Sequence, residues 1–546
     1  MRFSLFLPLL YSLTEATSCN YSAIFLPLKD VQVLPDIKNS YMRGISVTVG
    51  TPAQNIVVLP WAELNNTWLY DYEALCDTSI IFDDTICRVR RGNFFFENSS
   101  ATYIKGTNMA TVGGASIETA GYGAESGIAD LTTTSLAGSD IFSPGATNLS
   151  GFPIGIPRQN WDHGYTILHA MGMGTNSTYL NSLVQTGKIA SKVWSIFWGR
   201  MWIDQPLDGQ VVIGGYDQEK VIGQNYTQEL DFTNATGCWT GMKVTISDIR
   251  LIDRTGSTTS IFPPNFALPV CIVPQRQLLI EAPVSILDTF QNKTNTQTIG
   301  VSYGLHWLAQ LYDATNYFQG DMSIRLSSGL QVTIPNSQFM PPFVTIDRNG
   351  SRIFNESERE FLYGVTSDQP STLGRYFLTA AYLMINHDEN TFTLWQANPS
   401  TATDLVPTIS KHTVESCVNV TTNGTVVVNG TVTNEPGASG TIGASSPTTT
   451  ATQEKVGLSH GALVGIVVGI VAAVALLVGL GWLMFRRKKQ AAQIAEVTSQ
   501  RPPAFVPDST FAGFYEVHGN QSKHEMDASR RTYEYGHRAE PVQELP

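Results

Sequence analysis

The chain has 546 residues, of which 46 are acidic and 34 are basic, and its formal net charge is −12 at neutral pH. Only 15% of the residues are charged and 42% are hydrophobic, which favours a large folded body over a disordered chain. The acidic balance argues against binding along a nucleic-acid backbone, because that function requires a basic surface.

The chain begins with the pattern of a secretory signal peptide. Arg2 precedes the apolar run Phe3–Leu13, which is too short to span a bilayer, and the small residues at 16–18 suit a cleavage site. We therefore predict a signal peptide over residues 1–18. The alternative is an N-terminal strand that is buried in the fold.

Residues 19–400 alternate short β-branched runs with Gly, Asn, Asp and Pro turns, which is the pattern of a mostly β body. Asn-X-Ser/Thr sequons are dense in the part of the chain that we expect to lie outside the cell, in agreement with a glycoprotein. These sequons are at Asn20, Asn65, Asn98, Asn148, Asn176, Asn225, Asn234, Asn292, Asn349, Asn355, Asn419, Asn423 and Asn429.

Three further segments follow this body. Residues 401–457 are rich in Thr, Ser, Gly, Val and Asn and lack aromatic residues, so we expect a glycosylated stalk. Residues 458–485 are predicted to form a transmembrane helix. Residues 486–546 are predicted to form a disordered cytoplasmic tail, in which a Pro-rich stretch and tyrosines are candidates for partner binding or modification.

The predicted span is marked by charge as well as by length. Ala462–Phe485 carries no charge and is long enough to cross about 30 Å of hydrocarbon. The basic run Arg486–Lys489 follows, and positive charge marks the cytoplasmic side. We therefore expect a single-pass protein of the plasma membrane or cell surface with its N-terminus outside. Small residues every four positions, at Gly461, Gly465, Gly469 and Ala473, permit helix pairing but are also common in single spans.

Several motifs of the β body resemble, in their order along the chain, motifs of the pepsin family of aspartic proteases. They are Tyr41–Gln54 (YMRGISVTVGTPAQ) with a strand over Asn55–Leu59, Asn66–Leu69, Gly187–Ile189 with Val193–Ile196, Asp208–Asp217, Leu373–Leu378 and Tyr382–Asn390. The resemblance covers most of residues 40–400. The glycan density, stalk and tail are also similar to those of fungal plasma-membrane or cell-wall proteins.

The resemblance implies a bilobal, mostly β fold, with an N-lobe at about residues 40–205, a C-lobe at about residues 206–400 and a peptide-binding groove between them. In the family, each lobe donates one Asp-Thr/Ser-Gly turn. Two neighbouring carboxylates cannot both ionise, so they share a proton. One then takes a proton from water while the other protonates the substrate carbonyl.

This chain has no Asp-Thr-Gly or Asp-Ser-Gly sequence. Alignment with the family's motifs places the first turn at Trp61-Ala62-Glu63 and the second at Pro274-Gln275-Arg276. The segments of apolar residues and glycine that the family has near these turns are present, at Ala170–Gly172 and Leu373–Gly374. Trp61 and Pro274 offer no acid or base near neutral pH. We therefore predict that both catalytic positions are degenerate and that the chain has no catalytic residues. The alternative acid is Glu63, two positions from the first site.

The resemblance also implies a disulfide between Cys76 and Cys87. The other four cysteines form an even number, as a secreted protein favours, but their pairing stays open. Candidate pairs among them are Cys238 with Cys271, and Cys19 with Cys417, which flank the folded body.

Other kinds of site are weakly supported. The family carries a Tyr-Gly hairpin over its groove, for which Tyr122 is the candidate, although an ordinary surface hairpin explains it equally well. No Cys-x-x-Cys, His-Glu-x-x-His or Gly-x-Ser-x-Gly sequence occurs. We therefore expect neither a metal nor a cofactor.

The leading hypothesis is a catalytically inactive protease-like domain at the cell surface. It would act as a binding or sensor module for an extended peptide or a cell-wall polymer held in the groove, and the tail would recruit an unidentified partner. The alternative is a divergent, membrane-anchored aspartic endopeptidase that acts on extracellular proteins. A purely structural wall glycoprotein is the third possibility.

Overall fold

The computed structural model describes residues 21–73, 76, 81, 83–119, 128, 131–158, 168–233, 237–367 and 370–410. The predicted signal peptide, the transmembrane helix, the tail, nearly all of the stalk and the flap candidate Tyr122 lie outside these residues. Among the described residues, no helix is long and apolar enough to cross a membrane. All of the described residues belong to one compact unit.

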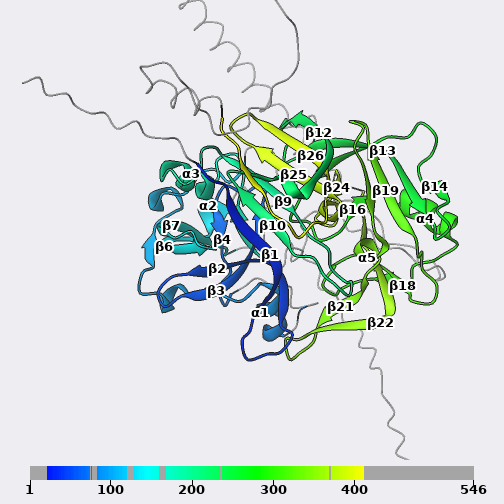
Figure 1. Cartoon of the computed structure of the whole chain (residues 1–546). Helices are drawn as coiled ribbons and strands as arrows, with labels where there is room; N and C mark the ends of the chain where they lie inside the picture. Colours follow the sequence, from blue (N-terminus) through cyan, green and yellow to red (C-terminus); the bar gives the residue numbers. More distant parts are fainter. Residues whose placement is uncertain are drawn as a thin grey trace, which may run out of the picture. The chain divides into compact units, whose positions relative to one another are not determined.

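Within the described part of the chain, one sheet of 13 strands runs through the N-terminal half and includes two strands near the end of the C-terminal half, Ala381–Asn386 and Thr391–Ala397 (Figure 1). In spatial order its strands are β12 (Val221–Glu229), β26 (Thr391–Ala397), β25 (Ala381–Asn386), β9 (Val193–Phe197), β10 (Gly209–Ile213), β1 (Ile24–Gln32), β2 (Tyr41–Val49), β3 (Gln54–Trp61), β8 (His169–Gly172), β4 (Thr67–Trp68), β7 (Leu149–Ile156), β6 (Leu136–Pro144) and β5 (Ile104–Gly106). We call the part from β2 to β5 the first lobe.

The second lobe is built on two further sheets. The larger sheet has β20 (Gln331–Ile334), β19 (Asp321–Leu326), β13 (Lys243–Ile252), β15 (Leu268–Ile272), β24 (Ser371–Leu373), β16 (Ile280–Ala282) and β23 (Tyr363–Val365), with β14 (Thr258–Ser260) beside β13. The smaller sheet has β17 (Gly300–Val301), β18 (Gln310–Asp313), β22 (Arg352–Phe361) and β21 (Pro342–Ile346). A separate pair joins β11 (Gly215–Asp217) to β27 (Leu405–Pro407).

Short helices connect these strands. They are α1 (Asp84–Arg90), α2 (Leu131–Thr134), α3 (Thr178–Gln185), α4 (Val284–Thr294) and α5 (Asn336–Phe339). The starts of α1 and α3 follow local side-chain chemistry. The Asp83 carboxylate accepts hydrogen bonds from the first amides of α1, and the Ser177 hydroxyl accepts one from Leu180 in α3.

The hairpin that carries the family resemblance forms as predicted. β2 pairs with β3 in antiparallel register, and Val47 lies opposite Ile56. The turn begins at Gly50, whose φ of 75° lies in the left-handed region that favours glycine. The alternating apolar side chains of both strands are buried, so the hairpin is anchored by its hydrophobic face.

The same arrangement of four strands recurs in both lobes. In the first lobe, β3 runs parallel to β8, β4 pairs antiparallel with β8, and β4 runs parallel to β7. In the second lobe, β15, β24, β16 and β23 make the same three pairings in the same order. The turn after β3 and the turn after β15 therefore occupy equivalent places.

The folded body extends beyond residue 400, and within the predicted body its first strand precedes the expected N-lobe. β1 precedes the expected N-lobe start at about residue 40, yet it pairs with both β10 and β2. β27 lies beyond the expected boundary at residue 400 and pairs with β11. Neither strand carries a motif of the family, and each is held by a partner far away in sequence.

Close backbone approach explains the glycine that closes each of these four-strand units. A Cβ atom on Gly172 would collide with the carbonyl oxygen of Asn66, and one on Gly374 would collide with the carbonyl oxygen of Leu278. These colliding atoms belong to the backbone of the two turns. Relief would therefore require movement of the turns themselves.

We predict that Gly172→Ala lowers the free energy of unfolding by about 1–3 kcal/mol, because the added methyl group overpacks the first turn. Chemical unfolding of the purified protein measures this loss. Thr258→Ala, at an exposed position of β14, serves as the control and should stay within about 0.5 kcal/mol of the parent. Equal stability of the two variants would contradict the close packing at Gly172.

Candidate functional site

The first-lobe turn follows β3 directly and is buried. Trp61 ends β3 opposite Gly172, and its carbonyl oxygen accepts a hydrogen bond of 2.9 Å from the Met173 amide. The Trp61 side chain is 1% exposed and Glu63 is 2% exposed. The residue that we predict at the family's first catalytic position is thus a buried indole, and a buried carboxyl group lies two residues further on.

A second buried carboxylate, Glu118, is bound to this turn. Its Oε1 accepts hydrogen bonds from the amides of Asn65 (3.0 Å) and Asn66 (3.1 Å), and its Oε2 accepts one from the Asn66 side-chain amide (2.8 Å). Burial raises the pKa of Glu118 to about 7, against the opposing effect of these donors. The sequence analysis missed this residue, because no local motif links it to a turn more than 50 residues away.

The second-lobe turn carries positive charge instead. Arg375 directly follows Gly374, and its guanidinium donates to the carbonyl oxygens of Gln275 (3.0 Å) and Arg276 (3.2 Å). Burial lowers the pKa of Arg375 to about 10, so it stays protonated near neutral pH. The Arg276 guanidinium lies 3.8 Å from the Glu281 carboxylate and 6.0 Å from the centroid of the Trp239 ring.

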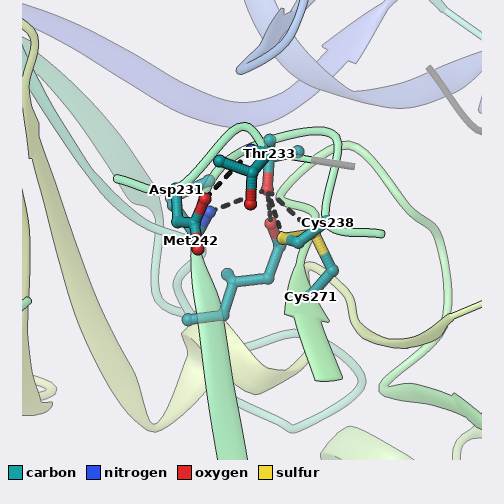
Figure 2. Close-up of a disulfide and its surroundings, with 7 residues drawn as sticks. Asp231, Thr233, Cys238, Met242 and Cys271 are labelled. Atoms are coloured by element: carbon teal, nitrogen blue, oxygen red, sulfur yellow. Dashed lines mark hydrogen bonds between the residues drawn. A yellow bond between two sulfur atoms is a disulfide. The ribbon is translucent and has the colours of Figure 1, made fainter. Parts of the chain in front are cut away.

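A disulfide fixes the strand that leads into this turn. Cys271 of β15 is bonded to Cys238 in the loop before β13 (Figure 2). Beside it, the Thr240 hydroxyl donates to the carbonyl oxygen of Ile272 at 2.7 Å, two residues before Pro274. The candidate pairing of these two cysteines is thereby confirmed, and it stiffens the entry to the second turn.

The position equivalent to Trp61 in the second lobe depends on which strand is used to align the lobes. In the antiparallel pairs, Trp68 lies opposite Ala170, two residues before Gly172, and Glu281 lies opposite Thr372, two residues before Gly374. Trp68 and Glu281 are therefore equivalent, and the residues seven positions before them are Trp61 and Pro274. The parallel ladders instead bring Trp61 opposite Gly172, whereas Ile272 lies opposite Leu373, one residue before Gly374. That register relates Trp61 to Val273. Neither Val273 nor Pro274 carries a carboxylate.

Two other expectations have definite outcomes. The disulfide between Cys76 and Cys87, which the family resemblance implied, is present. Among the sequons, Asn65 is 3% exposed and its side-chain amide donates to the Ile117 carbonyl oxygen, so it is closed to a glycan in the folded chain. The structure describes no cluster of His, Cys, Asp and Glu residues that could hold a metal ion.

Comparison with known proteins finds weak similarity to aspartic proteases. No family model matches the chain. Two sequences named Secreted aspartic protease 8 from Candida albicans, one of them from strain SC5314, are each 21% identical over 368 residues, or 66% of this chain and 77% of the protease. The solved aspartic proteinase from Irpex lacteus matches at 14% identity and a TM-score of 0.44, over 70% of this chain and 99% of that chain. The sequence match and the mostly β fold support the pepsin-like aspartic protease family for this chain.

Glu118 makes the stability of the first turn dependent on pH. Its pKa is higher in the folded chain than in the unfolded chain, so the unfolded chain loses this proton first as the pH rises. We therefore predict that the parent protein loses stability relative to Glu118→Gln by about 2 kcal/mol between about pH 5 and about pH 8. Urea unfolding of both proteins at several pH values checks this, and a constant difference would contradict it.

Proposed function

We propose that the chain is a single-pass cell-surface glycoprotein whose aspartic-protease-like domain binds an extracellular ligand without cleaving it. The observation that carries the proposal is the cationic second turn. The catalytic chemistry of this family requires a carboxylate from each lobe. At the second turn of this chain, the buried guanidinium of Arg375 instead donates hydrogen bonds to main-chain carbonyl oxygens.

The residues near the second turn cannot replace the missing acid. Arginine is a donor only and stays charged, so it cannot take a proton from water. Glu281 is engaged elsewhere, because it accepts a hydrogen bond of 2.8 Å from Thr372 and pairs with Arg276. The intact strand ladders of both lobes suit a fold that is kept for binding.

The ligand class in this proposal is an extended peptide or a cell-wall polymer that lies between the lobes. The predicted stalk would hold the domain away from the membrane, and the cytoplasmic tail would recruit a partner inside the cell. Six sequon asparagines of the described surface are exposed, which suits an extracellular domain; they are Asn98, Asn148, Asn176, Asn225, Asn292 and Asn349.

The alternative is a divergent, membrane-anchored aspartic endopeptidase, and a specific observation favours it. Glu63 and Glu118 are both buried at the first turn, and a carboxyl group with a pKa of about 7 is suited to general acid–base work. The alternative therefore requires the first lobe alone to supply both acids.

Peptide cleavage separates the two functions. We predict that the purified full chain produces no pepstatin-sensitive products from a peptide library, from about pH 3 to about pH 7, because neither Trp61 nor Pro274, at the predicted catalytic positions, carries a carboxylate that could share a proton. Mass spectrometry of the products is the measurement. Cleavage that pepstatin blocks and that Glu63→Gln or Glu118→Gln abolishes would instead establish the endopeptidase. Gln substitution at the exposed Glu229 is the matched control.

The anchoring part of the proposal has its own test. We predict that deletion of residues 458–546 releases the protein into the culture medium, whereas the full chain stays with the membrane fraction after alkaline washing. Immunoblotting of both fractions, with and without glycan removal, measures location and glycosylation together. A full chain that is found in the medium would contradict membrane anchoring.

A further inference from the structure

A small pocket lies where β2 of the first lobe meets the second lobe. Its cavity volume is about 20 Å³, which is room for one small group, and it is partly open to solvent. Its lining is unusually rich in cationic and polar side chains for so small a site, and we call it the arginine pocket. The lining residues are Met42, Arg43, Trp198, Met201, Gln277, Leu305, His306, Arg352, Arg375 and Tyr376.

Two of the three guanidinium groups in the arginine pocket have no carboxylate partner in the part of the chain that the structure describes. Arg43 donates only to the carbonyl oxygens of Trp198 and Leu207. Arg375 donates only to the carbonyl oxygens of Gln275 and Arg276. In each, Nη1 makes no hydrogen bond within the described residues. Both are buried, and a buried charge is costly without a counter-charge.

The two groups share one aromatic ring. The guanidinium carbons lie 5.8 Å (Arg43) and 5.0 Å (Arg375) from the centroid of the Trp198 ring. Burial is the main cause that lowers the pKa of Arg43, while the charges of Asp30 and Asp208 raise it and the smaller effect of Arg352 lowers it. The charges of Arg43 and Arg352 are therefore close enough to repel each other.

The third guanidinium, of Arg352, stands at an aromatic rim. It is paired in bidentate fashion with Asp30, at 3.0 Å for both contacts. Its central carbon lies 5.4 Å from the centroid of the Trp202 ring and 5.9 Å from that of Phe354, which is 47% exposed. A ligand at this rim would contact the Arg352 guanidinium and the rings of Trp202 and Phe354 together.

The remaining polar groups are held in fixed positions. His306 bonds to Glu360 through Nδ1 (2.6 Å) and to the Tyr376 hydroxyl through Nε2 (2.7 Å). Trp202, which packs edge-on against His306, has a φ of 59°, a left-handed conformation that a bulky residue rarely adopts. Backbone conformations of this kind persist where the surroundings enforce them, and they cluster at ligand sites.

We infer that the arginine pocket is a binding site for a small oxyanion, a carboxylate or an inorganic phosphate or sulfate, held by Arg43, Arg352 and Arg375. Guanidinium groups match the planar oxygen pairs of such anions in geometry as well as in charge. The site shares Arg375 with the second turn, but the inference does not depend on the proposed function. The aromatic rim favours a carboxylate that carries an apolar group, such as the C-terminus of a peptide.

Isothermal titration calorimetry of the purified full chain tests this inference with acetate, inorganic phosphate and sulfate as probes, in chloride buffer of constant ionic strength. We expect saturable binding that Arg352→Gln weakens by about tenfold. Asp30→Asn should tighten binding, because it removes the carboxylate that competes for Arg352. Arg359→Gln, on the same strand but paired with Glu356, is the control and should leave affinity unchanged.

Weaker binding by Arg352→Gln together with tighter binding by Asp30→Asn would distinguish a binding site from a structural role of the Arg352–Asp30 pair. A pocket that is merely structural would lose stability in both variants and gain affinity in neither, so thermal unfolding of each variant is recorded alongside. Absence of saturable binding by all three probes overturns the inference. Binding that neither variant alters also overturns it, because the anion then lies elsewhere.

A peptide that ends in leucine identifies the source of the oxyanion. The free acid is compared with the matching C-terminal amide in the same titration. Binding by the acid that exceeds that of acetate, with loss in the amide, supports a peptide carboxylate. Tighter binding of phosphate or sulfate than of the acid supports an inorganic anion. Both results require the same loss in Arg352→Gln.

Discussion

The two parallel strand pairs, β3 with β8 and β15 with β24, are the constraint on which the rest of this structure depends. Each pair positions a turn between strands that are far apart in sequence, and a glycine allows the turn's backbone to pack directly against the pair. Main-chain hydrogen bonds carry most of this arrangement. The architecture therefore depends little on which side chains the two turns carry.

Electrostatics differ sharply between the two turns. The first holds two buried carboxyl groups, Glu63 and Glu118, and the second is surrounded by the guanidinium groups of Arg276 and Arg375. A pair of carboxylates that share a proton requires equivalent acids at short distance, and this asymmetry opposes it. Of these two guanidinium groups, that of Arg375 has no carboxylate partner among the described residues, and it is well placed to hold an anion.

The sequence predicted the features that arise from local patterns or from family motifs. The hairpin of β2 and β3 follows from alternating apolar residues and a glycine turn, and the bridge between Cys76 and Cys87 follows from the resemblance. Glu118 could not be predicted, since its contacts with Asn65 and Asn66 exist only after the fold brings distant segments together.

Arg375 did leave a signal in the sequence. It is a charged residue inside the otherwise apolar and aromatic segment Leu373–Leu378, and such a residue requires acceptors when it is buried. The identity of its acceptors, the carbonyl oxygens of the second turn, depends on the packing of β24 against β15. The arginine pocket combines residues from both lobes, so it has no counterpart in any single motif.

Binding of pepstatin, an inhibitor of aspartic proteases, tests the central claim that no catalytic carboxylate pair survives between the lobes. Calorimetric titration of the purified full chain at acidic pH is the direct measurement, since it reports on the inhibitor site whether or not a substrate is known. The present account predicts no saturable heat of binding. Stoichiometric binding that a Gln substitution at one buried carboxylate removes would contradict it.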